Sequence, residues 1–280
     1  MRSFNVKLIT QAVKDLFIET NNVLPEDIIY AISNSRKNET NSLACSTLDT
    51  LLLNVEAAKE INVPICQDTG MAVVFLKIGQ EVFLEGGNLN EAVNEGVRLA
   101  YADGYLRKSV VADPLNRTNT GDNTPAIIHT EIVPGDRIEI TAAPKGFGSE
   151  NMSGVKMLTP SAGREGVIRA VMDIVKSAGS NPCPPMVVGV GIGGDFEQVA
   201  IMSKKALCRP LNVKNSNPFY AQLEQELLEK INSLGIGPQG FGGNTTALGV
   251  NIEYGPTHIA GLPVAVNIGC HVTRHKTIIL

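Results

Sequence analysis

The sequence predicts a mixed α/β protein in which a helical N-terminal layer is followed by mixed β-sheets covered by helices. Two observations support this fold class. Over residues 1–104, apolar residues recur mostly at the three- and four-residue spacing of helices. Over residues 105–280, short apolar runs typical of strands alternate with helical patterns and turn signals. Because the 280 residues contain no repeat, low-complexity segment or obvious linker, we expect a single domain over residues 1–280 with these two parts.

The first part contains four predicted helices and one buried strand. The helices show apolar residues on one face, and Pro25 suits the first turn of the second helix. Asparagine and glycine are expected to mark the two ends of the fourth helix. The predicted elements are helices that start near Val6, Pro25, Ser42 and Asn90, with Asn90 as a cap and Gly104 closing the last helix, and a strand over residues 72–78.

The second part begins with an irregular stretch over residues 105–125. A loop of this length in a compact domain is usually functional or disordered, and the apolar segments on both sides favour an ordered functional loop. After it, two strand patterns flank a Pro-Gly-Asp turn, which predicts a hairpin. The predicted elements are strands over 126–133, 137–143, 186–192 and 264–268, a half-exposed strand from Leu248 to Tyr254, and helices over 159–179 and 218–234.

Composition and charge exclude several classes of protein. The net charge of −4 provides no electrostatic basis for binding nucleic acid. No run is long and apolar enough to span a bilayer, and Lys7, Lys14 and Asp15 interrupt the apolar pattern at the N-terminus, which argues against a signal peptide. We therefore expect a cytoplasmic protein that binds neither nucleic acid nor membrane.

The five cysteines predict separate thiols, because their number is odd and no CxxC pair occurs. Cys66, Cys183 and Cys270 lie beside proline or glycine at the ends of predicted elements, where side chains from distant segments can converge. Cys45 and Cys208 lie in helix-like settings. Three thiolates could hold an iron–sulfur cluster with one open iron, which is a Lewis acid. On spacing alone, ordinary thiols are the more common outcome.

Several other groups are candidates for chemistry. The stretch Pro64–Gly70 places a thiol, an amide, a carboxylate and a hydroxyl in one bend, and the glycines of residues 144–151 would let the backbone approach a ligand. Arg107 could bind a carboxylate, and His258, in a predicted loop, could be an acid–base group. The alternatives are a polar turn with a buried thiol, a surface ion pair and an ordinary surface imidazole.

The glycines at positions 189, 191 and 194 match the dinucleotide-binding pattern after a strand. The next helix, however, opens with Asp195-Phe196-Glu197, whose two carboxylates would face the pyrophosphate. Close backbone packing at the end of a strand is therefore favoured over NAD binding.

Four stretches together carry a resemblance to a known family. They are Pro64–Gly70, Tyr105–Arg107, Asp122–Ala126 and Lys145–Asn151. In combination they resemble the alpha subunit of the class I, iron–sulfur-dependent fumarate hydratases, and the related L-tartrate dehydratase alpha subunits share the pattern. The likeness extends over nearly the whole chain. One departure is Phe147, where many relatives have a third glycine.

The resemblance implies a set of ligands and site residues. The implied ligands of a [4Fe–4S] cluster with one iron open to substrate are Cys66, Cys183 and Cys270. The implied substrate-binding residues for a dicarboxylate are Gln67, Asp68, Arg107, Gly148 and Asn151. The implied catalytic residues are His258 and Asp68.

The resemblance also implies an activity and a partner. The expected reaction is the reversible dehydration of (S)-malate to fumarate, with L-tartrate as the alternative substrate. Because the chain stops at Leu280, soon after its last cysteine, the catalytic base is expected on a separate beta subunit, in an assembly of two alpha and two beta subunits. From other classes, a non-catalytic iron–sulfur redox sensor and an NAD-dependent oxidoreductase stay as alternatives.

Overall fold

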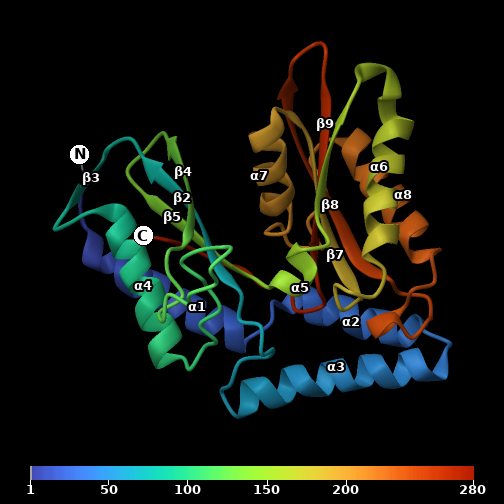
Figure 1. Ribbon diagram of the computed structural model, residues 1–280, viewed down its shortest axis with the longest axis horizontal. Coiled ribbons are helices and arrows are strands. Elements are labelled where there is room, and N and C mark those ends of the chain that lie inside the picture. Colours follow the sequence, from blue (N-terminus) through green and yellow to red (C-terminus); the bar gives the residue numbers. More distant parts are fainter. Residues whose placement is uncertain (1) are drawn as a thin grey trace. The chain divides into compact units, whose positions relative to one another are not determined.

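The computed structural model describes residues 2–280 and confirms the mixed α/β class (Figure 1). Contacts divide the chain into two compact units that interleave along the sequence. Unit 1 holds the described residues up to Pro25, Val55–Phe147 and Arg274–Leu280, and unit 2 holds Glu26–Asn54 and Gly148–Thr273. Each unit has its own four-stranded sheet and its own apolar core. The single domain expected over residues 1–280 stays a prediction.

The longer elements follow the apolar patterns of the sequence. Unit 1 contains β1 (Arg2–Asn5), α1 (Val6–Asn22), β2 (Met71–Gly79), β3 (Val82–Glu85), α4 (Leu89–Asp103), β4 (Ile127–Val133), β5 (Ile138–Lys145) and β10 (Lys276–Ile279). Unit 2 contains α2 (Glu26–Asn38), β6 (Gly154–Leu158), α6 (Gly163–Ala178), β7 (Met186–Gly194), α7 (Phe196–Ala206), α8 (Pro218–Asn232), β8 (Ala247–Thr257) and β9 (Leu262–Gly269). Helices α3 (Ser42–Glu60) and α5 (Phe147–Glu150) contribute residues to both. No helix among residues 2–280 has the length and apolar character needed to cross a bilayer.

The core of unit 1 lies between its sheet, in the order β10-β5-β2-β4, and helices α1 and α4. Helix α1 presents Ile9, Val13 and Phe17 to this core, because these residues recur on one helix face. The cap of α4 is Asn88, whose side chain accepts from the N–H of Asn90. The expectation that Asn90 is the cap is therefore wrong by two residues: Asn88 keeps the extended backbone of a cap, and Asn90 is already helical.

The predicted hairpin between residues 126–133 and 137–143 is wrong. β4 and β5 do not pair with each other, because β2 lies between them, parallel to β4 and antiparallel to β5. β2 is almost entirely apolar and buried, and a central position between two strands satisfies the hydrogen bonds of its backbone on both edges. The Pro134–Asp136 turn instead carries the chain past the end of β2, where the N–H of Gly79 donates to the Arg137 carbonyl at 2.8 Å.

The core of unit 2 lies between its sheet, in the order β6-β9-β7-β8, and helices α6 and α8, while α7 covers the other face (Figure 1). β7 alternates valine and glycine. Val188 and Val190 belong to the core with α6 and α8. Gly189 and Gly191 face α7: an added Cβ would lie 2.2 Å from a carbonyl oxygen of that helix in each case. Close packing of helix on strand thus requires these two glycines.

This packing accounts for the glycine pattern that matches a dinucleotide site. The interpretation as close backbone packing is confirmed, because an added Cβ at each of the three glycines of the pattern, 189, 191 and 194, would meet α7. The N-terminus of α7 is capped by Asp195, whose Oδ1 accepts from the N–H groups of Glu197 at 3.2 Å and Gln198 at 2.9 Å. The chain's own carboxylate therefore occupies the place that a pyrophosphate would take.

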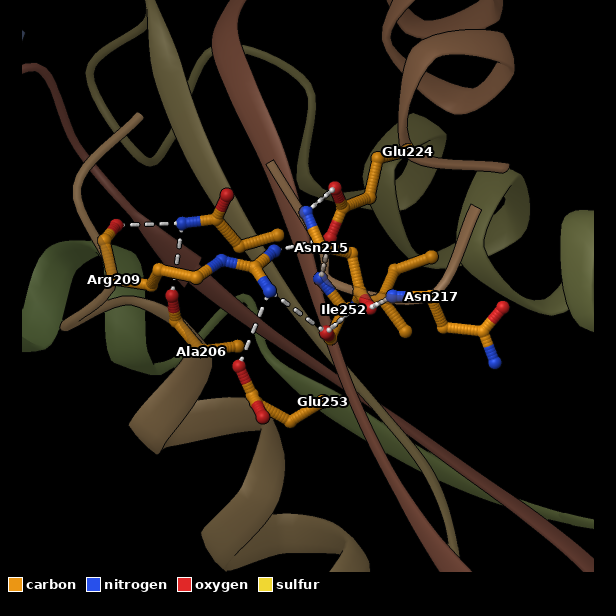
Figure 2. A network of polar contacts seen from close by, with 8 residues as sticks. Ala206, Arg209, Asn215, Asn217, Glu224, Ile252 and Glu253 are labelled. Atoms are coloured by element: carbon orange, nitrogen blue, oxygen red, sulfur yellow. Dashed lines mark hydrogen bonds and ion pairs between the residues drawn. The ribbon is translucent and has the colours of Figure 1, made fainter. Parts of the chain in front are cut away.

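A polar network joins α8 to β8 and to the segment after α7 (Figure 2). The Glu224 carboxylate pairs with the Arg209 guanidinium, and the side chains of the two residues are only 10% and 16% exposed. Oε1 of Glu224 also accepts from the N–H of Ile252 at 2.7 Å, and Oε2 accepts from the N–H of Asn215 at 3.3 Å. Arg209 reaches Glu253 at 3.3 Å. One buried carboxylate therefore accepts hydrogen bonds from three separate segments of unit 2.

Glu39 is a second buried carboxylate of unit 2, and its loss is expected to destabilise the protein in a pH-dependent way. Burial alone would raise its pKa, but backbone N–H groups of Asn41, Asn244, Thr40 and Thr245 together hold the pKa below its ordinary value. A pKa depressed in the folded state contributes stability above the ordinary value near 4.5, and that stability is lost as the pH falls below it.

We expect Glu39→Gln to lower the free energy of unfolding by about 2 kcal/mol at pH 7, because charged hydrogen bonds become weaker neutral ones. Urea unfolding at pH 7 and pH 3 measures this. The difference from the wild type should be smaller at pH 3 than at pH 7, because the stability that a lowered pKa contributes is lost as the pH falls through it. Glu56→Gln, at an exposed position of α3, is the control. An equal difference at both pH values would contradict the account.

Candidate functional site

The turn over residues 66–70 lies in unit 1, between the end of α3 and the start of β2. Pro64 cannot continue a helix, and Gly70 takes a positive φ of 79°. A Cβ at position 70 would also lie 2.6 Å from the backbone of Lys145. The prediction that Gly70 permits a sharp bend is confirmed, and the bend leaves Cys66 partly exposed.

The carboxylate of Asp68 is bound by amides of the same unit. Oδ1 accepts from the N–H of Gly70 at 3.0 Å, and Oδ2 accepts from the N–H of Phe147 at 2.8 Å. Gly146 permits this approach, because a Cβ there would lie 3.1 Å from Oδ2. The segment with glycines at 146 and 148, the glycine loop, does present an amide to an anion, as expected, but the anion is the carboxylate of Asp68. The helix that follows the loop, α5, is a single turn.

Thr69 ties the backbone of Arg107 to the same turn. The N–H of Arg107 donates to Oγ1 of Thr69 at 2.9 Å, and the Thr69 hydroxyl donates to the Arg107 carbonyl at 3.2 Å. Thr69 is buried, whereas the side chain of Arg107 is exposed. Unit 1 therefore brings the backbone of Arg107 to Cys66, Gln67 and Asp68, with the guanidinium accessible to an anion.

Cys183 lies in unit 2, in a tight bend before β7. Its φ is 54°, a conformation that few residues other than glycine adopt. Its N–H donates to the Ser180 carbonyl at 3.1 Å, and Gln239 donates to the Pro184 carbonyl from its backbone at 2.8 Å and from its side chain at 2.7 Å. These contacts hold the bend and leave Cys183 exposed.

Cys270 follows β9, and its turn lies beside the Cys183 bend in unit 2. The carbonyl oxygen of Cys183 lies 3.4 Å from the backbone nitrogen of His271 and 3.0 Å from its Nδ1. The N–H of Val272 donates to the sulfur of Cys270 at 3.4 Å, a contact that stabilises negative charge on the sulfur. Unit 2 therefore brings the Cys183 and Cys270 segments together.

The residues after the glycine loop enter unit 2 at the Cys270 end of β9. The Glu150 carboxylate accepts from Nδ2 of Asn267, three residues before Cys270, at 3.1 Å. Gly148 and Asn151 flank this contact, and both are exposed. No heavy atom lies within 4 Å of a Cβ placed on Gly148, so its backbone is accessible from that side.

His258 lies at the other end of β9. β8 runs to Thr257, so the residues just before His258 belong to a strand and not to the predicted loop. The imidazole Nδ1 accepts from the N–H of Ala260 at 3.1 Å. Because the eight residues of β9 span roughly 25 Å at about 3.3 Å each, unit 2 does not bring His258 to Cys270.

The five thiols differ in whether they suit metal binding. Cys183 is exposed, and Cys66 and Cys270 are partly exposed. Burial raises the pKa of Cys208 to about 12, so Cys208 stays a neutral thiol, whereas the thiolate is the form that binds metal. Cys45 lies within α3 and donates to the Glu39 carbonyl. The donor set at the three element ends therefore fits a thiolate-bound metal group, and Cys208 does not.

Neither unit holds a metal site by itself: within residues 2–280, no three His, Cys, Asp or Glu side chains of one unit are arranged around a common point. Cys66 belongs to unit 1, and Cys183 and Cys270 belong to unit 2. The meeting of all three thiols at one cluster stays a prediction.

The sequence matches known proteins over nearly its whole length. The family model described as Fumarate hydratase (Fumerase) matches residues 10–279. The chain belongs to the fumarate hydratase family. It is 45% identical over 272 residues, 95% of each chain, to the "Putative L(+)-tartrate dehydratase subunit alpha" of Methanocaldococcus jannaschii. It is 35% identical over 279 residues to the L(+)-tartrate dehydratase subunit alpha of Escherichia coli O157:H7, covering 98% of this chain and 91% of that one.

These matches confirm the family resemblance, including the tartrate dehydratase relatives. Fumarate hydratases are hydro-lyases, so the family places this chain among hydro-lyase subunits. The matched range contains the Cys66, Cys183 and Cys270 segments of both units.

Five polar residues that support the site segments belong to no chemical motif in the sequence. They are Tyr101, Asn123, Gln239, His271 and Arg274. Only Asn123 lies in a stretch, Asp122–Ala126, that carries the family resemblance, and that stretch is the signal that could have identified it. The other four contact residues that are distant in the sequence, so no local motif identifies them.

Proposed function

We propose that this chain is the alpha subunit of an iron–sulfur hydro-lyase that dehydrates a 2-hydroxydicarboxylate, with L(+)-tartrate as the favoured substrate. The observation that carries the proposal is the unit 1 turn, which joins an accessible thiol, an amide-bound carboxylate and the Arg107 backbone. Relatives named L(+)-tartrate dehydratase favour tartrate over malate, the substrate that the family resemblance implies first.

In this proposal Cys66, Cys183 and Cys270 hold a [4Fe–4S] cluster. All three are accessible thiols at the ends of elements, and the sulfur of Cys270 already accepts a backbone hydrogen bond. When bound, the cluster supplies an open iron that acts as a Lewis acid toward the hydroxyl leaving group of the substrate.

The dicarboxylate substrate is proposed to bind at Gln67, Asp68, Arg107, Gly148 and Asn151. Arg107 can grip a carboxylate through two parallel hydrogen bonds, since its guanidinium is exposed while Thr69 fixes its backbone. The accessible backbone of Gly148 and the exposed amide of Asn151 add neutral donors. The Asp68 carboxylate, held by two amides, is proposed to take part in proton transfer.

The two hydrogen bonds between the Thr69 hydroxyl and the Arg107 backbone, called the clamp below, predict a specific effect on substrate binding. We expect Thr69→Val to raise KM about tenfold with a smaller change in kcat, because two hydrogen bonds of about 1 kcal/mol each fix the Arg107 backbone. Thr69→Ser keeps the hydroxyl and should keep KM within about threefold. Steady-state kinetics of both variants tests the clamp, and an unchanged KM in Thr69→Val would remove it from the account.

His258 stays a predicted catalytic residue. If it transfers a proton at the reacting centre, His258→Asn should lower kcat by about a hundredfold or more. Because His258 lies across β9 from Cys270 in unit 2, a variant with wild-type kcat would remove it from the mechanism.

The relatives are named as alpha subunits, so we propose that a separate beta subunit supplies the catalytic base, in an assembly of two alpha and two beta subunits. The isolated chain should then show less than about 1% of the activity of the two-subunit enzyme, because a general base contributes about 10²–10⁴-fold. Activity of the chain alone and after addition of the beta subunit measures this. Full turnover by the chain alone would refute the need for a partner.

The substrate is tested with the two-subunit enzyme purified without oxygen. We expect kcat/KM for L(+)-tartrate to exceed that for (S)-malate by about tenfold or more, as one hydroxyl recognised by hydrogen bonds can provide. The opposite ratio would support the second candidate, a fumarate hydratase, which the description of the family model favours. Absence of turnover and of dicarboxylate binding would instead support a non-catalytic iron–sulfur protein.

A further inference from the structure

The three backbone carbonyls of Asp68, Thr69 and Gly70 are all bound by side chains from elsewhere in unit 1. The Asp68 carbonyl accepts from Nη2 of Arg274 at 2.6 Å. The Tyr101 hydroxyl lies 2.7 Å from the Thr69 carbonyl and 2.9 Å from that of Gly70. The Gly70 carbonyl also accepts from Nδ2 of Asn123 at 3.2 Å.

These three donors are among the most buried polar side chains of unit 1. Tyr101 is 1% exposed, Asn123 is 0% exposed and Arg274 is 5% exposed. They come from α4, from the loop over residues 105–125 and from the segment before β10, so three distant parts of the chain converge on one turn. Buried polar groups are costly unless they are paired, and each of these is paired to the turn.

Each donor also has a property that suits a fixed support. Burial raises the pKa of Tyr101 far above its ordinary value, so its hydroxyl keeps its proton. Oδ1 of Asn123 accepts from the N–H groups of Ser109 at 2.7 Å and Val110 at 3.1 Å, which couples the Arg107 loop to the turn. Arg274 is a buried cation without a carboxylate partner within the described residues, and its Nε has no hydrogen-bond partner.

An arrangement made only for stability would not need a buried guanidinium on a carbonyl, since an apolar side chain would avoid its desolvation. A site whose reactive groups must keep one geometry does need such support, because a small displacement of a ligand or an acid–base group costs activity. The supported turn is the one that carries Cys66 and Asp68.

We infer that Tyr101, Asn123 and Arg274 are positioning residues that hold the turn of Cys66, Gln67 and Asp68 in the geometry needed for cluster binding and catalysis. The inference rests on the proposed function for the roles of Cys66 and Asp68. Arg274 belongs to the same unit as the turn that it supports.

The experiment compares Tyr101→Phe, which removes one hydroxyl, and Arg274→Met, which removes the guanidinium, with the wild type. Arg274→Lys restores a cationic donor, and Tyr30→Phe, at an exposed tyrosine of α2, is the matched control. Hydrogen exchange of the iron-free chain is measured for a peptide over residues 65–71, with a peptide over β7 as reference. Iron content, kcat and KM are then measured for the anaerobically reconstituted two-subunit enzyme.

We expect exchange over residues 65–71 to become about tenfold faster in Tyr101→Phe and Arg274→Met, because the turn loses a buried hydrogen bond. Exchange in β7 should not change. The reconstituted variants should bind less iron or show a kcat about tenfold lower with KM within about twofold, and Arg274→Lys should recover part of the loss. Tyr30→Phe should match the wild type.

Two outcomes overturn the inference and leave the proposed function standing. In the first, the wild type binds iron, and the variants bind as much iron and have the same kcat. In the second, hydrogen exchange becomes faster over all of unit 1, which would indicate a general loss of stability. A wild-type enzyme that binds no iron overturns the proposed function, and it also overturns the role of the three residues in positioning a cluster ligand. The exchange measurement needs no iron, so the two failures are distinguishable.

Discussion

Cys183→Ser is expected to lower the dehydratase activity of the two-subunit enzyme about a thousandfold and to remove most of its bound iron. Serine keeps the size of the side chain, but it replaces a soft thiolate with a hydroxyl that is a poor ligand for an iron–sulfur cluster. A metal centre that polarises the leaving group contributes several kcal/mol to the barrier, and each 1.4 kcal/mol is about tenfold in rate. Iron assay and initial rates under anaerobic conditions measure both effects.

Cys45→Ser is the matched control, because Cys45 is a partly exposed thiol, like Cys66 and Cys270, but lies within α3. It should retain its iron and its activity within about twofold. Cys66→Ser and Cys270→Ser should behave like Cys183→Ser. A Cys183→Ser enzyme that kept both its iron and its rate would contradict the assignment of the ligands.

Glu224→Gln is expected to lower the free energy of unfolding by about 3 kcal/mol, more than Glu39→Gln. The substitution keeps the shape of the side chain but leaves the buried guanidinium of Arg209 with only the more exposed Glu253 as a charged partner (Figure 2). Removal of one partner of a buried ion pair typically costs about 3–5 kcal/mol, since the remaining charge is desolvated without compensation. Urea unfolding followed by circular dichroism measures the change.

The exposed pair of Arg36 and Asp49 in α2 and α3 provides the comparison. Its atoms lie 2.7 Å apart, but both side chains are more than one third exposed, so Asp49→Asn should cost less than about 1 kcal/mol. Glu224→Leu should cost more than Glu224→Gln, because leucine also leaves the N–H groups of Ile252 and Asn215 without an acceptor. Equal effects of Glu224→Gln and Asp49→Asn would show that burial does not govern the strength of the Arg209 pair.

The sequence predicts the long elements of both units because their patterns are local. Helices α1, α6 and α8 repeat apolar residues on one face, and β2, β7 and β9 are continuous apolar runs. The strands β1, β3, β6 and β10 have only four or five residues, too few to show a period. β6 and β10 form against the longer strands β9 and β5, whereas β1 and β3 pair with each other, and the sequence pattern reveals none of these pairings.

The hairpin prediction fails for a related reason. The Pro134–Asp136 turn correctly indicates a reversal between β4 and β5, but it does not reveal that β2 lies between them. Sheet order depends on which strand gains most from burial on both edges, and that is a property of the whole unit. The cap of α4 shows a smaller case, in which two asparagines two residues apart compete for one position.

The candidate site shows the same division between local and distant features. The bend at Gly70 and the close approach of the glycine loop follow from local residue types, and both are present. The donors that hold the turn are not local: Arg274 binds a carbonyl 206 positions earlier in the chain. No spacing rule could assign that contact, because it depends on the completed fold of unit 1.

Cys66, Cys183 and Cys270 are proposed to bind a single iron–sulfur cluster. The most direct test is anomalous X-ray scattering at the iron edge from crystals of the two-subunit enzyme grown without oxygen. We predict one cluster of four irons per alpha chain, with three of the irons each bonded to the sulfur atom of one of these cysteines. Sulfur atoms in separate places, with no iron between them in an active enzyme, would contradict it.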